Sequence, residues 1–118
     1  MQAALYHKDI FLPAPIASLG ARTIAPRVTR HAEQAAQNDR YGCIAIPSRV
    51  TFSGKDVVEA ELSEGRVVKL VVRVPYDATR DLVLAIGFDK GESFVKTVWF
   101  NLKSDTHKTL KRHLYATR

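Results

Sequence analysis

Apolar and polar residues alternate along four segments in the second half of the chain, which is typical of β-strands that bury one face. The segments span residues 57–62, 66–74, 81–88 and 93–102. Short turns separate most of them, and the clearest contains glycine, Asp89-Lys90-Gly91-Glu92. Because short turns join antiparallel neighbours, we expect these strands to pair antiparallel in chain order.

A helical period replaces the alternation in residues 26–40. Pro26 suits a first helical position, and Gly42 follows the expected end of the helix. The apolar stripe of this segment consists mostly of small residues, namely Val28, Ala32, Ala35 and Ala36. We therefore expect the helix to lie close on one face of the sheet.

Prolines mark the less regular parts of the chain. Residues 1–26 contain Pro13, Pro15 and Pro26, which indicates an irregular N-terminal arm. Residues 44–52 are interrupted by Pro47, which is typical of an edge or irregular strand.

The order of the elements predicts the fold class. A short terminal helix can be capped by Ser104 or Asp105 and end near Leu114. Runs of strands with segregated helices are typical of α+β proteins. We therefore predict an α+β fold in which an N-terminal helix packs on a four- to five-stranded antiparallel sheet, followed by a short C-terminal helix. The chain of 118 residues suits one core, so residues 27–118 are expected to form a single domain after the arm of residues 1–26.

The charge of the chain points to a class of partner. The formal net charge is +6 and the pI is about 9.7. The last 23 residues hold six lysines and arginines against the single acid Asp105. Such a charge favours polyanions, because binding to phosphates releases counterions. RNA is the partner that we favour, and the alternative is a solvated basic helix that binds nothing.

The composition disfavours several other classes of protein. No stretch of about 18 apolar residues occurs, so we expect no membrane-spanning segment. Lys8 and Asp9 interrupt the N-terminal apolar region, which argues against a secretion signal. Cys43 is the single cysteine, so we expect neither an internal disulfide nor a cysteine-based zinc site. A cytoplasmic location is the resulting expectation.

The sequence also lacks the common cofactor motifs. The four histidines show no metal-ligand spacing, and neither a P-loop nor a dinucleotide fingerprint occurs. We therefore expect neither a metal nor another cofactor.

The densest group of polar residues lies in residues 96–115, KTVWFNLKSDTHKTLKRHLY. RNA cleavage through the 2′-hydroxyl needs a base, an acid and cations that stabilise charge on phosphorus. His107 is the candidate for the acid or the base. Arg73 and Lys96 are the candidates for charge stabilisation, and Tyr115 is the candidate for base stacking or proton transfer. Lys108 is an alternative to Lys96.

These candidates have structural alternatives. A histidine such as His107 at the start of a helix is more commonly a surface residue. Arg73 at the end of a strand commonly pairs with an acid, here Asp77 or Asp81.

Further residues are candidates for nucleic-acid contacts by charge, stacking or hydrogen bonding. They are Lys103, Lys108, Lys111, Arg112, Trp99 and Asn101. Trp99 is otherwise a core residue or a lid on the sheet. Alternation places Val95, Thr97, Trp99 and Asn101 on one face of the last strand, and Phe94, Lys96, Val98 and Phe100 on the other. Polar residues interrupt both rows, so the pattern leaves open which face is buried.

Three segments in order, RHAEQAAQNDRYG, VVKLVVRVPYDATRDLVLAI and VKTVWFNLKSDTHKTL, resemble small uncharacterised phage and prophage proteins. Their layout is also similar to the broad RelE/barnase/EndoU-like group of metal-independent ribonucleases and toxins. In that group a helix precedes an antiparallel sheet, and polar residues on the open face of the sheet act on RNA. By matching position, the resemblance implicates His31, Arg73, Lys96, Thr97, Asn101, His107 and Tyr115. The N-terminal arm is a departure from the usual minimal toxin.

Two hypotheses for function follow. The first is an RNA-binding protein of RelE/barnase-like fold, which is a metal-independent endoribonuclease if His107 is catalytic, with a cognate inhibitor protein as an expected partner. The alternative is a small non-enzymatic phage protein that binds and inhibits or redirects a host protein through the arm and the basic helix. A structural component of a virion is a third reading.

Overall fold

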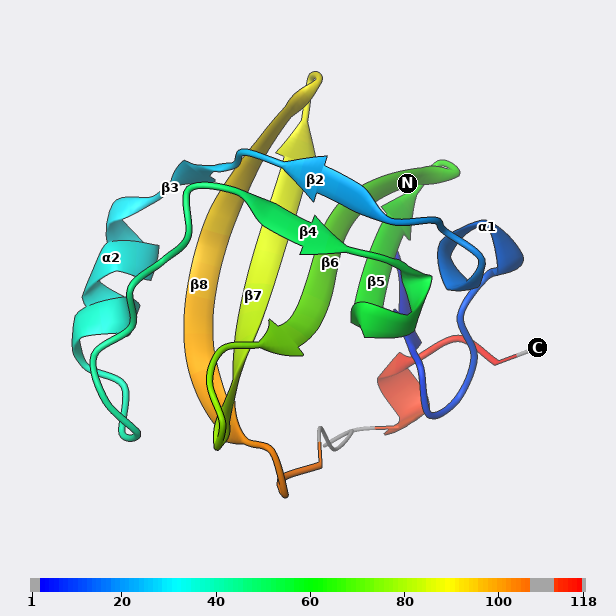
Figure 1. Ribbon diagram of the computed structural model, residues 1–118. Coiled ribbons are helices and arrows are strands. Elements are labelled where there is room, and N and C mark those ends of the chain that lie inside the picture. The colour runs from blue at the N-terminus through cyan, green and yellow to red at the C-terminus, as the bar shows by residue number, and fades with distance from the viewer. Residues whose placement is uncertain (1–2, 107–111, 118) are drawn as a thin grey trace.

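The computed structural model describes residues 3–106 and 112–117, and β-strands are its main secondary structure (Figure 1). The strands are β1 (Ala4–His7), β2 (Arg22–Ile24), β3 (Arg27–Val28), β4 (Val50–Phe52), β5 (Val57–Ser63), β6 (Arg66–Pro75), β7 (Arg80–Asp89) and β8 (Glu92–Leu102). The α-helices are α1 (Ala14–Ala17) and α2 (Arg30–Gln37), and the 3₁₀ helices are η1 (Gly54–Asp56) and η2 (Arg112–Leu114). Among the described residues, no helix has the length and apolar character that crossing a membrane requires.

Six strands form one curved sheet in the order β1-β5-β6-β7-β8-β3 (Figure 1). Neighbouring strands are antiparallel except for β3, which runs parallel to β8. β2 and β4 form a separate antiparallel pair that crosses one face of the large sheet (Figure 1). We call the face of the large sheet under β2 and β4 the inner face, and the opposite one the outer face.

The predicted α+β fold, with an N-terminal helix packed on a four- to five-stranded sheet, is wrong. The sheet has six strands, and the β2–β4 pair covers it instead (Figure 1). The reason is the small apolar surface of α2, which has eight residues and buries only Ala32 and Ala36. Two alanines bury too little area to cover a sheet face, and Val50 and Phe52 of β4 supply what the helix does not.

Helix α2 begins later than the sequence predicts, because the residues before it pair with β8. Arg27 and Val28 form β3, and Thr29 is the N-cap. The Thr29 hydroxyl accepts a hydrogen bond from the backbone N–H of Ala32 at 3.1 Å, one of the donors that no helical carbonyl can reach. The same hydroxyl donates to the carbonyl oxygen of Val95 in β8 at 2.8 Å. Thr29 therefore ties the start of the helix to the edge of the sheet.

The four strands predicted between residues 57 and 102 are present as β5 to β8. Two of the turns between them have two residues at positive φ, Glu64-Gly65 and Lys90-Gly91. Positive φ at both central residues is the type I′ geometry, whose twist matches that of antiparallel strands. The predicted C-terminal helix from Ser104 or Asp105 is wrong at its start, since residues 105–106 are not helical. Its middle, residues 107–111, lies outside the described residues.

A β-bulge in β8 decides which of its side chains are buried. The register steps from Ala85 opposite Thr97 to Ile86 opposite Val95, so Lys96 is an extra residue in β8. Val95 therefore faces the core together with Val98 and Phe100, although simple alternation separates it from them. Because of the bulge, Phe94 lies on the outer face with Thr97, Trp99 and Asn101.

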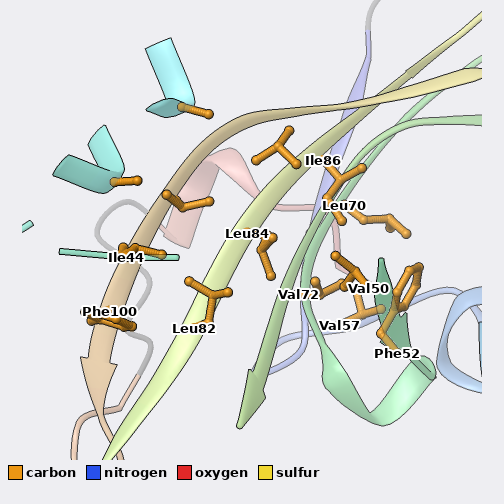
Figure 2. Packing of buried hydrophobic residues seen from close by; sticks show 14 of the residues in the cluster. Ile44, Val50, Phe52, Val57, Leu70, Val72, Leu82, Leu84, Ile86 and Phe100 are labelled. Carbon is orange, nitrogen blue, oxygen red and sulfur yellow. The ribbon is translucent and has the colours of Figure 1, made fainter. Parts of the chain in front are cut away.

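The main core lies between the inner face and the β2–β4 pair. Figure 2 shows its buried side chains, which include Val50 and Phe52 of β4, Leu70 and Val72 of β6, Leu82, Leu84 and Ile86 of β7, and Phe100 of β8. Leu82, Leu84, Ile86 and Phe88 share this face, as the alternation predicts. The largest fully buried side chains include Phe100, Leu82, Leu84 and Ile86. Burying each of these side chains contributes about 1.5–3 kcal/mol to the stability of the fold. The core on the inner face therefore holds in place the strands that also form the outer face.

Candidate nucleic-acid interface

The outer face of β6, β7 and β8 is a mixed polar and apolar surface. Cross-strand partners define its rows: Arg73, Val83 and Trp99 in one, and Val71, Ala85 and Thr97 in the next. Asp81 and Asn101 extend it toward one end of the strands, and Lys69, Gly87 and Phe94 extend it toward the other.

A small apolar cluster forms the centre of the outer face. Val58, Val71, Val83 and Ala85 are all buried there, and the half-buried ring of Trp99 packs against them. Trp99 is therefore a lid on the sheet, which is one of the two structural alternatives considered for it. Its half-exposed ring also gives the outer face an aromatic surface.

Three charged residues meet at the end of the outer face nearest the β6–β7 turn. The Nε atom of Arg73 donates to Oδ2 of Asp81 at 2.8 Å, and Nζ of Lys103 donates to Oδ1 at 2.7 Å. Burial alone would raise the pKa of Asp81, but the hydrogen bonds and charges of Lys103 and Arg73 outweigh it and lower that pKa. Two cations share one carboxylate, so the group carries a net positive charge. Of the two ion-pair partners considered for Arg73, the structure selects Asp81.

Two further contacts fix the guanidinium of Arg73. Its Nη2 donates to the carbonyl oxygen of Leu102 at 3.0 Å. With the Asn101 amide oriented to satisfy both neighbours, its oxygen accepts from Nη1 of Arg73 at 3.2 Å and its nitrogen donates to the carbonyl oxygen of Phe100 at 3.3 Å. Arg73 and Asn101 are therefore preorganised side chains at the end of β8.

A shallow hollow lies at the other end of β8, beside the bulge. It is lined by Thr29, His31, Phe94, Lys96 and Thr97 and has a volume of about 450 Å³. We call it the β8 hollow. His31 and Lys96 are exposed, and the Thr29 side chain is fixed by its hydrogen bonds with the backbone of Val95, Lys96 and Ala32. The hollow thus combines an imidazole, an ammonium group, two hydroxyls and an aromatic ring.

A second cation lies close to the β8 hollow. The guanidinium of Arg27 in β3 is 5.8 Å from the centroid of the Phe94 ring, within the range of a cation–π contact. Arg27 and Lys96 therefore add positive charge at this end of β8, as Arg73 and Lys103 do at the other. Seven residues from Lys96 to Lys103 span about 23 Å in extended conformation.

The structure brings together seven of the residues that the sequence singles out. Lys96 and Thr97 line the β8 hollow, and Trp99, Asn101, Arg73 and Lys103 continue along the outer face. His31, implicated through the resemblance, joins Lys96 and Thr97 in the hollow. Three other candidates, His107, Lys108 and Lys111, lie outside the described residues. Of Arg112, the structure describes only the backbone, at the start of η2.

Tyr115 lies elsewhere on the sheet. Its hydroxyl donates to Oε1 of Glu59 in β5 at 2.8 Å, and its ring meets that of His7 edge to face at 5.3 Å between centroids. Burial, and then the contact with Glu59, raise the pKa of Tyr115 to about 12. β5 is three strands away from the Lys96 strand, so Tyr115 and the β8 hollow are separate features.

Sequence reasoning missed several residues of the interface. Phe94, Thr29 and Arg27 escaped notice because a bulge and a two-residue strand leave no periodic signal. His7, which the sequence does not mark as a core residue, is fully buried, and its Nδ1 accepts a hydrogen bond from the backbone N–H of Asp9 at 3.1 Å. His7 is therefore a packing residue of β1, with its ring against that of Tyr115.

Across the part of the chain that the structure describes, no three His, Cys, Asp or Glu side chains gather as metal ligands would. Comparison with protein-family models, with curated protein sequences and with solved structures found no match to the chain.

Proposed function

We propose that the protein binds RNA along the outer side of β8. The observation that supports this most is the arrangement of cations at both ends of one strand, Arg27 and Lys96 at the β8 hollow and Arg73 and Lys103 at the Asp81 end. Phosphates along a nucleic-acid strand are spaced so that separated cations can each contact one. The overall charge of +6 adds a long-range attraction.

The residues between these cations suit the rest of a nucleotide. The ring of Trp99 offers a stacking surface, and stacking tolerates any base because every base has a π-face. Thr97 and Asn101 can form hydrogen bonds with base edges or 2′-hydroxyls, which distinguish RNA from DNA. The apolar cluster under Trp99 holds this row in place.

The proposal is tested by fluorescence anisotropy with a labelled single-stranded RNA across a range of salt concentrations. Lys96→Glu and Lys103→Glu are expected to weaken binding, and each lost phosphate contact should reduce the slope of log affinity against log salt by about 0.7. Lys55→Glu is the matched control, because Lys55 is an exposed lysine in η1, away from β8. Binding that survives both β8 reversals and shows no salt dependence would overturn the proposal and favour the alternative, a host-protein partner.

RNA cleavage is a second candidate function, favoured by His31 and Lys96 lining the same hollow. An imidazole can take the proton of a 2′-hydroxyl, and an ammonium group stabilises charge that develops on the phosphate. The 2′-oxygen then bonds to phosphorus as the bond to the 5′-oxygen breaks, giving a 2′,3′-cyclic phosphate and a 5′-hydroxyl. His107 is the further candidate for the acid.

Cleavage is tested by incubating wild type, His31→Gln and His107→Ala with labelled RNA in EDTA. A 2′,3′-cyclic phosphate end made by wild type and lost in either variant, with binding retained, would support a metal-independent ribonuclease. Intact RNA after incubation with a binding-competent wild type would leave the protein a binding module.

A further inference from the structure

The ring of Phe94 occupies the space that a side chain at position 87 would take. Gly87 in β7 is directly opposite Phe94 in β8. A Cβ atom built on Gly87 would lie 2.5 Å from Cζ and 2.6 Å from Cε2 of Phe94, closer than real Cβ contacts. Glycine at position 87 therefore lets the ring lean against the backbone of β7.

This seat gives the Phe94 ring a fixed place in the β8 hollow. The ring rests on the Gly87 backbone, and the Arg27 guanidinium lies 5.8 Å from its centroid. The ring is only half-buried and lines the hollow with Thr29, His31, Lys96 and Thr97. A volume of about 450 Å³ falls in the range of small-ligand sites, roughly 300–1,000 Å³. The charge around it is positive, so its occupant is expected to carry a negative group.

We propose that the β8 hollow binds one unpaired nucleobase against the Phe94 ring, with Lys96 and Arg27 contacting the adjoining phosphates. This rests on the proposed RNA binding and makes single-stranded RNA its substrate class. Bases inside a duplex are stacked and paired, so they cannot enter a side-chain-lined hollow, whereas unpaired bases can be splayed out onto an aromatic ring.

A purely structural role for Phe94 makes a different prediction. Aromatic rings also cover glycines in sheets and stabilise them by shielding the backbone. In that case the removal of the ring lowers thermal stability but leaves the preference for unpaired bases unchanged. The two roles are therefore separated by measuring RNA affinity and unfolding on the same variants.

The experiment compares three labelled probes by anisotropy: a 12-residue single-stranded RNA, the same strand in a duplex, and the same backbone with abasic positions at its centre. Wild type is expected to bind the single strand about 5- to 150-fold more tightly than the abasic strand, the range measured for base–aromatic stacking. Phe94→Leu should remove this preference without changing the salt slope, because stacking releases no counterions. Phe94→Tyr, which keeps the ring, should retain it.

Gly87→Ala provides a second variant that keeps the ring but displaces it from its seat. It should lose the same preference, and adding it to Phe94→Leu should cause no further loss. Salt-dependent RNA binding by wild type with equal affinity for the intact and abasic strands would overturn the base site and leave the proposed function standing. No RNA binding by wild type would overturn both.

Discussion

The Nε atom of Arg73 in β6 donates a 2.8 Å hydrogen bond to Oδ2 of Asp81 in β7. Both side chains are mostly buried, 14% and 17% exposed, and Lys103 completes the group through Oδ1 of the same carboxylate. Asp81→Asn keeps the size of the side chain but removes its charge, leaving two cations close together. We expect a loss of about 1–3 kcal/mol in the free energy of unfolding at neutral pH, measured by urea denaturation. Asp89→Asn, at the exposed far end of β7, is the control.

The loss should depend on pH in a defined direction. The folded-state pKa of Asp81 is lowered, so the ionised carboxylate stabilises the fold above the unfolded pKa of about 3.9. This contribution is lost as the pH falls through the folded-state pKa. Wild type and Asp81→Asn should therefore converge in stability at the acidic end of a pH series. A constant difference at every pH would contradict this account.

The strands of the second half of the chain could be predicted because local signals agree there. Alternation sets the faces of β6 and β7, and glycine turns set the β5–β6 connection at Glu64-Gly65 and the β7–β8 connection at Lys90-Gly91. The bulge at Lys96 could not be predicted in this way. An extra residue in a strand changes which side chains are buried, but only the pairing with β7 reveals it.

The cover of the sheet was predicted least well. The sequence predicts a helix with alanines on one side. The apolar surface that this helix can bury depends on its length, and α2 is shorter than predicted because its N-cap is Thr29. β4 forms only at the end of the irregular strand predicted for residues 44–52, and its three residues do not reveal that it pairs with β2 across the sheet. The residues of the candidate site also divide into those that the sequence predicted and those that only the structure reveals. Lys96, Trp99 and Asn101 were named from their chemistry, whereas Phe94 needed the position of Gly87.

The backbone at Gly54 in η1 is packed against α1, so a substitution at this position tests the packing of α1 on η1. Its N–H donates to the carbonyl oxygen of Leu19 at 2.8 Å, and a Cβ would lie 2.4 Å from the carbonyl oxygens of Ile16 and Ala17. Gly54→Ala is therefore expected to lower the free energy of unfolding by about 1–3 kcal/mol, because backbone atoms cannot move aside as a flexible side chain can.

Gly20→Ala is the matched control in the same part of the chain. No atom lies within 4 Å of a Cβ built on Gly20, so this variant should be near wild type in urea denaturation. Equal stability of the two variants would show that α1 does not pack on η1 in solution.

Thr29 links the helix start, β8 and the β8 hollow, so its loss should affect both stability and binding. Thr29→Ala removes the N-cap acceptor for Ala32 and the donor to Val95, with an expected loss of about 1–2 kcal/mol in unfolding free energy. Thr29→Ser keeps the hydroxyl and should therefore retain most of the free energy of unfolding that Thr29→Ala loses. Hydrogen exchange of the α2 amides would show the effect locally, and equal protection in both variants would contradict the capping role.

The Tyr115 hydroxyl is expected to titrate at a higher pH than an ordinary tyrosine. Burial and then the nearby Glu59 raise its pKa to about 12, above the usual value of about 10. Because the folded-state pKa is raised, the protonated hydroxyl stabilises the fold fully below about pH 10, and this contribution is lost as the pH rises through about 12. An ultraviolet absorbance titration of wild type should show a late component that Tyr115→Phe lacks. In urea, all four tyrosines should titrate together. A late component that persists in Tyr115→Phe would place the shifted group elsewhere and show that the Tyr115 hydroxyl is not held against Glu59 of β5.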